Sequence, residues 1–165
     1  MKVPKGLDHV AVLLEPASII EKGIIQAYEA QRRFKIWRPR KAAVLGAGTV
    51  GLLAALSLKM KGFDVASVGK QCEPSRNLDL LAQLGVRYVS TNDMSIREAA
   101  KRFESFDLMF EATGYSPVVF EARGCLGKNG VLVLARSPAG IASIRFQPTR
   151  SSWISCSATN WSWAP

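Results

Sequence analysis

The sequence predicts an α/β fold, a doubly wound parallel sheet of five to six strands with an N-terminal leading helix. Two observations predict it. Between residues 41 and 135, short apolar runs alternate with segments in which apolar residues recur every three or four positions. A glycine-rich turn joins the first apolar run to the first of these helical segments. Because strands that alternate with helices need right-handed crossovers, the sheet is expected to be parallel.

Residues 1–40 are expected to form a leading segment with one amphipathic helix over 17–34. Ser18 is the expected N-cap, and Glu21, three residues later, would complete a capping box. The residues expected to form the apolar stripe of this helix are Ile20, Ile24, Ala27 and Tyr28.

Residues 41–135 are expected to form the sheet domain. Ala42–Leu45 is an apolar run typical of a strand buried on both faces, and Gly62 ends the helix that follows it. Further strands are expected at 64–68, 86–89, 107–111 and 130–134, and helices at 50–61, 73–84, 95–103 and 117–123. In such a fold a ligand lies outside the carboxyl ends of the strands.

The turn between the first strand and its helix carries the spacing GxGxxG. Gly46 permits a tight turn, Gly48 lets the backbone approach a ligand, and Gly51 lets helix and strand pack closely. The helix beginning near Thr49 directs its unpaired N–H groups and its positive dipole end at an anion. This strand–turn–helix context predicts a Rossmann dinucleotide site. A glycine-rich turn that only packs a helix on a sheet is the alternative.

Composition limits the other classes of function. The 165 residues are 48% hydrophobic and 21% charged, which is typical of one globular domain, and no apolar run reaches the roughly 18 residues of a membrane span. The first residues, MKVPKGLDHVAV, lack the long apolar core of a signal peptide, so a cytoplasmic protein is expected. The three cysteines form no CxxC pair. Despite the net charge of +9, the basic residues between 32 and 41 indicate a solvated helix end, so no nucleic-acid partner is expected.

Four segments carry a resemblance to a known family. They are DHVAVLLEPASIIEKGI, AAVLGAGTVGLLAAL, VGKQCEPSRNLDLLAQLGVRYVST, and FDLMFEATGYSPVVFEA followed by GVLVL. Together they cover about residues 3–135. In order and spacing they resemble the carboxyl-terminal, nucleotide-binding part of archaeal-type glucose 1-dehydrogenases, in the zinc-dependent medium-chain dehydrogenase/reductase superfamily.

The resemblance implies an oxidoreductase that oxidises an aldose such as glucose at C1 and transfers the hydride to NADP. Its zinc ligands belong to an amino-terminal catalytic domain that this sequence is expected to lack, so no metal ligand is assigned. His9 is the only histidine, and Glu15 alone matches a family position at the metal and sugar site. The chain is therefore expected to be catalytically incomplete, and to meet an aldose only if a catalytic domain is supplied.

The end of the second strand indicates which nucleotide is bound. An NAD site usually carries an acid there, whereas this strand ends in Gly69 and Lys70. A lysine attracts the 2′-phosphate that a carboxylate would repel, and Arg76 is a second candidate contact. NADP is therefore expected, with NAD and a plain surface lysine as alternatives.

The loop after the fourth strand, Glu111 to Gly114, runs beside the nicotinamide ribose in the resembled family. A plain strand–helix turn is the alternative. The cofactor-binding candidates are thus Gly46, Gly48, Thr49, Val50, Gly51, Gly69, Lys70, Arg76, Ala112, Thr113 and Gly114.

Residues 136–165 form an atypical tail that contains three of the four tryptophans and no charge after Arg150. A sixth strand at 141–146, a poorly ordered end, and a frame-altered end are all open. Three other functions stay open for the whole chain. They are a non-catalytic nucleotide-binding module, a homo-oligomerising remnant, and an S-adenosylmethionine-dependent methyltransferase.

Overall fold

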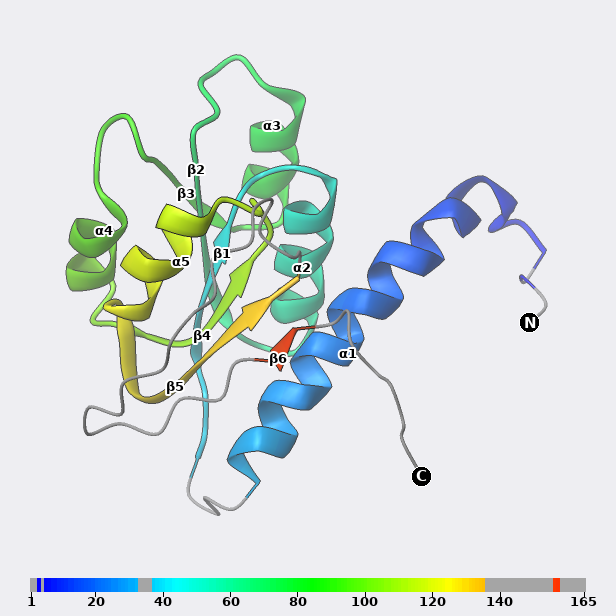
Figure 1. Cartoon of the computed structure of the whole chain (residues 1–165). Coiled ribbons are helices and arrows are strands. Elements are labelled where there is room, and N and C mark those ends of the chain that lie inside the picture. The colour runs from blue at the N-terminus through cyan, green and yellow to red at the C-terminus, as the bar shows by residue number, and fades with distance from the viewer. Residues whose placement is uncertain (1–2, 4, 33–36, 136–155, 158–165) are drawn as a thin grey trace.

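The computed structural model describes residues 3, 5–32, 37–135 and 156–157. Its sheet has the strand order β3-β2-β1-β4-β5-β6, with every pairing parallel (Figure 1). The strands are β1 (Lys41–Leu45), β2 (Asp64–Gly69), β3 (Arg87–Ser90), β4 (Phe106–Glu111), β5 (Leu126–Leu134) and the two-residue β6 (Cys156–Ser157). The predicted parallel α/β fold is confirmed.

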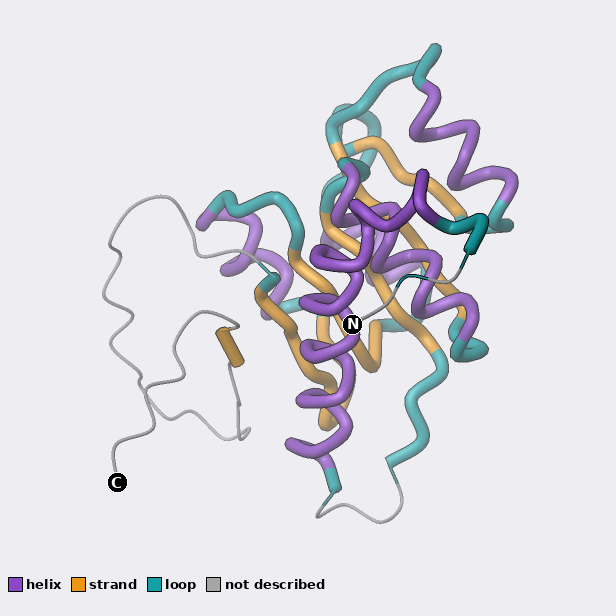
Figure 2. Tube along the Cα trace, turned by 90° about the vertical axis from the view of Figure 1, so that its right-hand side faces the viewer, coloured by secondary structure: helices purple, strands orange, loops and turns teal. Residues whose placement is uncertain are grey.

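Helices cover both faces of the sheet, as the edge-on view in Figure 2 shows. On one face lie α1 (Leu14–Gln31), α2 (Thr49–Met60) and α3 (Arg76–Gln83), and on the other α4 (Ile96–Arg102) and α5 (Ser116–Arg123). Successive residues of β1 alternate between the two cores: Val44 joins the first and Leu45 the second. The apolar run in the sequence therefore reflects burial on both faces.

The start of α1 differs from the prediction. The helix begins at Leu14, directly after the 3-10 helix Asp8–Leu13, and Ser18 lies inside it, donating to the Glu15 carbonyl at 2.8 Å. The expected N-cap at Ser18 and the capping box with Glu21 are wrong. Pro16 sits in the first turn, where a missing N–H costs nothing, so the helix can begin before it. The predicted helix end at residue 34 lies outside the described residues.

The apolar stripe of α1 is largely as predicted. Ile20, Ile24 and Ala27 are buried against the sheet and α2, whereas Tyr28 is 41% exposed. Tyr28 instead packs edge-on against the ring of Trp37, with 5.4 Å between centroids. Its place in the stripe is therefore wrong.

The remaining elements lie close to their predicted ranges. Gly62 and Gly85 follow α2 and α3 with φ of 85° and 64°, left-handed values that suit glycine and end a helix. Strand β5 begins at Leu126, four residues before the predicted 130. The sixth strand expected at 141–146 lies outside the described residues. Within the described part of the chain, no helix is long and apolar enough to cross a membrane.

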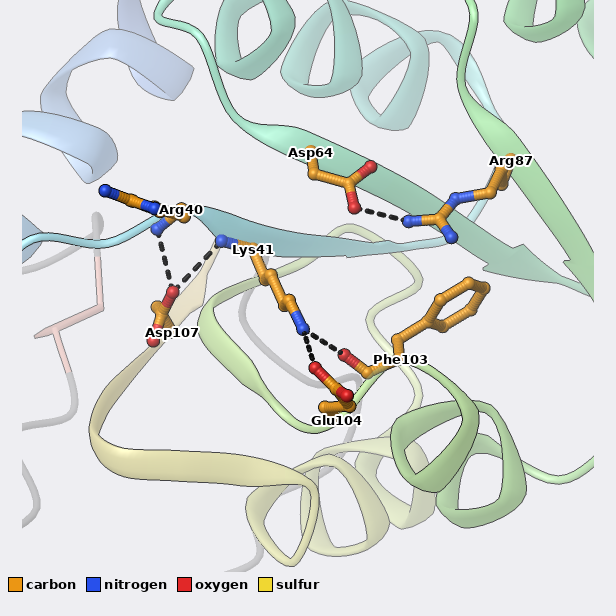
Figure 3. A network of polar contacts seen from close by, with 7 residues as sticks. All are labelled: Arg40, Lys41, Asp64, Arg87, Phe103, Glu104 and Asp107. Carbon is orange, nitrogen blue, oxygen red and sulfur yellow. Dashed lines mark hydrogen bonds and ion pairs between the residues drawn. The ribbon is translucent and has the colours of Figure 1, made fainter.

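Polar groups at the amino-terminal edge of the sheet pair with one another (Figure 3). The Lys41 ammonium donates to the Phe103 carbonyl at 3.1 Å and to Glu104 Oε2 at 2.5 Å. One oxygen of Asp107 accepts the backbone N–H groups of Arg40 and Lys41, at 2.8 and 3.0 Å. These contacts fix the entry into β1 against the entry into β4.

Candidate functional site

The glycine-rich turn lies at the carboxyl end of β1, at the centre of the sheet. Gly46 has φ of 102°, and a Cβ there would lie 3.1 Å from the Thr113 side chain. Its N–H donates to the Val68 carbonyl at 2.7 Å, which joins the turn to β2. Position 46 therefore requires glycine, because its backbone is left-handed and because the loop after β4 approaches it closely.

The other two glycines of the motif have opposite surroundings. A Cβ on Gly51 would lie 1.9 Å from the Gly46 carbonyl oxygen, so helix and turn touch through bare backbone. A Cβ on Gly48 would meet nothing described within 4 Å, and no side chain of the described residues caps α2, which starts at the exposed Thr49. Val50 is half-buried behind it. The first turn of α2 thus presents free N–H groups at an open surface, which suits an anion.

A cavity of about 220 Å³ opens beside this turn. Its walls come from the carboxyl ends of β1 and β2, from the loops after β3 and β4, and from α4 and α5. They are Leu45, Gly46, Val68, Gly69, Lys70, Thr91, Ile96, Thr113, Tyr115 and Val118. The lining is mostly apolar with a few polar groups at its rim, which is the usual character of a small-molecule site.

The end of β2 carries no acid at the cavity. Asp64 lies at the opposite end of the strand, where it pairs with Arg87 at 2.5 Å. Gly69 is buried, and a Cβ there would lie 3.1 Å from the Tyr88 hydroxyl. Lys70 is exposed, and its ammonium lies 5.4 Å from the centroid of the Tyr115 ring. The positive charge therefore stands at the mouth of the cavity, held over an aromatic face.

Tyr88 supports the segment that follows β2. Its hydroxyl donates to the Gln71 carbonyl at 2.9 Å, and burial raises the pKa of this tyrosine above its ordinary value of 10.0. The hydroxyl therefore stays protonated and donating at neutral pH. Arg76, the first residue of α3, is exposed and does not line the cavity.

The loop after β4 is organised by a fully buried carboxylate. Glu111 Oε1 accepts the Thr113 N–H at 2.5 Å, the Thr113 hydroxyl, and the Gly114 N–H at 2.9 Å. The Ala112 N–H donates to the Leu45 carbonyl at 2.9 Å. Glu111 Oε2 has no hydrogen-bond partner among the described residues. Residues 112–114 are thus fixed beside the glycine turn, with a spare acceptor behind them.

Comparison with known protein families identifies the chain. Residues 8–149 match the family described as glucose dehydrogenase C-terminus. The chain belongs to this family. The match includes all of β1 to β5 and every candidate site residue, so the site just described lies inside the family's shared domain.

Curated relatives support the same assignment. Glucose 1-dehydrogenase of Methanocella arvoryzae is 42% identical over 132 residues, covering 80% of this chain and 36% of the relative. Glucose 1-dehydrogenase 1 of Vulcanisaeta moutnovskia is 34% identical over 155 residues, covering 93% of this chain and 42% of the relative. The chain therefore spans about two fifths of the length of these relatives.

Solved structures agree. Haloferax mediterranei glucose dehydrogenase in complex with NADP, Zn and gluconolactone superposes with a TM-score of 0.80 at 30% identity, covering 88% of this chain and 41% of that one. A further structure of Haloferax mediterranei glucose dehydrogenase gives a TM-score of 0.83 at 26% identity, with 95% and 47% covered.

The expected features of a sugar and metal site are not gathered in one place. Glu15 is exposed in the first turn of α1 and does not line the cavity, and His9 lies in the preceding 3-10 helix. Among the described residues no three histidine, cysteine, aspartate or glutamate side chains are grouped to hold a metal ion. Those residues do not fit a catalytic zinc.

Six of the residues that line the cavity were not among the sequence candidates: Leu45, Val68, Thr91, Ile96, Tyr115 and Val118. Two of them, Thr91 and Tyr115, carry a hydroxyl group. Each follows the carboxyl end of a strand, Thr91 directly after β3 and Tyr115 four residues after β4. The rule that ligands bind at the carboxyl ends of parallel strands was the available signal for both.

Proposed function

We propose that this chain binds a nicotinamide dinucleotide, NADP in preference to NAD, as the nucleotide-binding domain of a glucose dehydrogenase-type oxidoreductase. The observation that carries the proposal is the contrast within the glycine turn. Gly46 and Gly51 are closed against the protein, whereas Gly48 is open at the first turn of α2. An open backbone at a helix N-terminus is what a pyrophosphate requires.

The adenosine end of the nucleotide is assigned to the cavity. Its apolar walls, among them Val68, Ile96 and Val118, suit the faces of an adenine ring. Lys70 stands at its mouth with no acid at the end of β2, so a 2′-phosphate meets a positive charge there. Arg76 is the proposed second contact to this phosphate.

The nicotinamide end is assigned to residues Ala112 to Gly114. Glu111 accepts two backbone N–H groups of this loop and so sets its position beside Gly46. When bound, the nicotinamide ring supplies the hydride acceptor. This chain's own residues orient the dinucleotide and exclude water from one of its faces.

Oxidation of the sugar is proposed to need residues beyond this sequence. The sequence has one histidine and three scattered cysteines, which supports binding without turnover by the 165-residue chain alone. Glu15 is proposed to reach the metal or sugar only when such residues are supplied. The aldose, glucose in the named relatives, remains part of this proposal.

Thermal unfolding with added ligand tests the proposal. At about 100 times its Kd, a ligand of the native state adds about 2.7 kcal/mol of stability, so NADP should raise the Tm by roughly 5–10 °C. NAD should raise it less, and S-adenosylmethionine not at all. Glucose with NADP should give no NADPH.

Lys70→Ala sharpens the test. This change removes the charge at the mouth of the cavity and should weaken NADP binding while leaving NAD binding unchanged. Absence of any Tm shift with either dinucleotide would support a non-binding remnant, and a shift with S-adenosylmethionine would support a methyltransferase.

A further inference from the structure

A side chain of α3 ties the glycine turn to the next βα unit. Asn77, in the first turn of α3, donates its amide N–H to the Ala47 carbonyl at 2.8 Å across 30 residues of sequence. Ala47 is the residue between the first two glycines of the motif and is 4% exposed. We propose that Asn77 is a positioning residue for the pyrophosphate loop, a role that rests on the proposed dinucleotide function.

Peptide geometry gives this hydrogen bond its consequence. The peptide that joins Ala47 to Gly48 is planar and trans, so its C=O and N–H point in opposite directions. Because Asn77 holds the carbonyl toward α3, the Gly48 N–H is held facing away from α3. The orientation of a phosphate-binding N–H group is thereby fixed before any ligand arrives, which lowers the ordering cost of binding.

Asn77 also joins two parts of the proposed site. Its neighbour Arg76 begins α3 and is the proposed second contact to a 2′-phosphate. Gly69, at the end of β2, packs against the same turn, since a Cβ there would lie 3.5 Å from the Ala47 nitrogen. The turn is also joined to β2, by the hydrogen bond from the Gly46 N–H to the Val68 carbonyl, and both of these groups belong to the backbone. The Asn77 amide is the tie that a substitution can remove.

The chemistry of the contact is unambiguous. A backbone carbonyl only accepts hydrogen bonds, so the Asn77 amide must present its N–H₂ group to Ala47. Replacement by alanine removes the donor. Replacement by aspartate keeps the shape and sets a carboxylate oxygen against the carbonyl oxygen.

The experiment measures Kd by calorimetry for NADP, NAD and 2′-AMP, which lacks a pyrophosphate. Asn77→Ala should weaken NADP and NAD by the same factor, about tenfold, as expected for one hydrogen bond, and leave 2′-AMP unchanged. Lys70→Ala is the matched control with the opposite pattern: weaker NADP and 2′-AMP, unchanged NAD.

Asn77→Asp adds a second measurement, the pH dependence of NAD affinity, which should not change if Asn77 only supports the fold. At pH 7 its carboxylate cannot donate, so NAD binding should be weaker than in Asn77→Ala. As the pH falls to about 4.5, toward the ordinary carboxyl pKa of about 3.9, the growing protonated fraction can donate. NAD affinity, relative to wild type at each pH, should then recover in Asn77→Asp and stay flat in Asn77→Ala.

Three outcomes overturn the inference. NAD affinity within twofold of wild type in Asn77→Ala would show that the hydrogen bond does not position the loop. An equal loss of 2′-AMP affinity would indicate general damage to the domain. A wild-type chain that binds 2′-AMP but neither dinucleotide, or no nucleotide at all, would refute the proposed function itself, and that failure is visible before any variant is made.

Discussion

The polar groups at the two ends of the parallel strands differ in whether they are paired. At the amino-terminal edge, Lys41, Glu104 and Asp107 pair with one another or with backbone groups, as Figure 3 shows. At the carboxyl edge, the first turn of α2 has no side-chain cap among the described residues, and Glu111 keeps one oxygen without a described partner. The polar groups at the amino-terminal edge therefore pair within the protein, whereas hydrogen-bonding groups at the carboxyl edge have no described partner.

The difference separates stability from binding. Buried polar groups are nearly always paired in folded proteins, so groups left unpaired at one edge are candidates for a ligand. Removing a contact at the amino-terminal edge should lower stability and leave nucleotide affinity alone. Changing a group at the carboxyl edge that makes no contact within the protein should lower nucleotide affinity and leave stability alone.

The largest expected effect distinguishes two glycines that are three residues apart. Gly51→Ala would place a methyl group 1.9 Å from the Gly46 carbonyl oxygen, which forces α2 away from the turn. Overpacking of this kind costs about 3 kcal/mol, so the Tm should fall by roughly 10 °C. Thermal unfolding followed by circular dichroism measures it.

Gly48→Ala is the matched control. A Cβ there meets nothing within 4 Å and the backbone φ of −80° is allowed for alanine, so the Tm should stay within about 2 °C of wild type. Its methyl group would occupy the space proposed for the pyrophosphate, and the NADP Kd should rise at least tenfold. An unchanged Kd in a folded Gly48→Ala would remove the main support for the site.

A smaller effect is expected at the amino-terminal edge. Asp107→Ala removes the acceptor shared by the N–H groups of Arg40 and Lys41, at a cost of about 1 kcal/mol, or a Tm lower by roughly 2–4 °C. Asp107→Asn keeps an acceptor oxygen and should recover most of the loss. NADP affinity should be unchanged in both, and a loss of affinity would contradict the separation of the two edges.

Local patterns in the sequence determined much of this outcome. Glycine spacing and apolar periodicity are properties of neighbouring residues, so they located the turn at Gly46, the helix ends at Gly62 and Gly85, and the order of strands and helices. The family's nucleotide-binding domain followed from the same segments. Ranges were less exact at the start of β5, because Gly127 and Gly130 lie inside the strand and do not mark its beginning.

The capping-box pattern failed at Ser18, for a physical reason. The spacing Ser-x-x-Glu occurs at Ser18 and at Ser95, and only the second forms a capping box, with the Glu98 N–H donating to the Ser95 hydroxyl at 3.2 Å. At Ser18 the chain is already helical. Contacts between distant residues, such as Asn77 with Ala47, leave no local trace and had to be found in three dimensions.

The smallest effect expected is electrostatic and depends on pH. A hydrogen bond from Lys41, and then the attraction of its charge, hold the pKa of Glu104 below its ordinary value of 4.5. The ionised carboxylate therefore stabilises the folded state above about pH 4.5, and this contribution is lost as the pH falls through the lowered pKa. Glu104→Gln should lower the Tm slightly at pH 7 and not at all near pH 3.

The Lys41–Glu104 pair is exposed, so 1 M salt should also shrink the difference in Tm at pH 7. A Tm difference that persists unchanged in acid and in salt would show that Glu104 acts through its shape in the turn and not through its charge. In that case the amino-terminal edge would be closed by packing, and the contrast with the carboxyl edge would lose its electrostatic part.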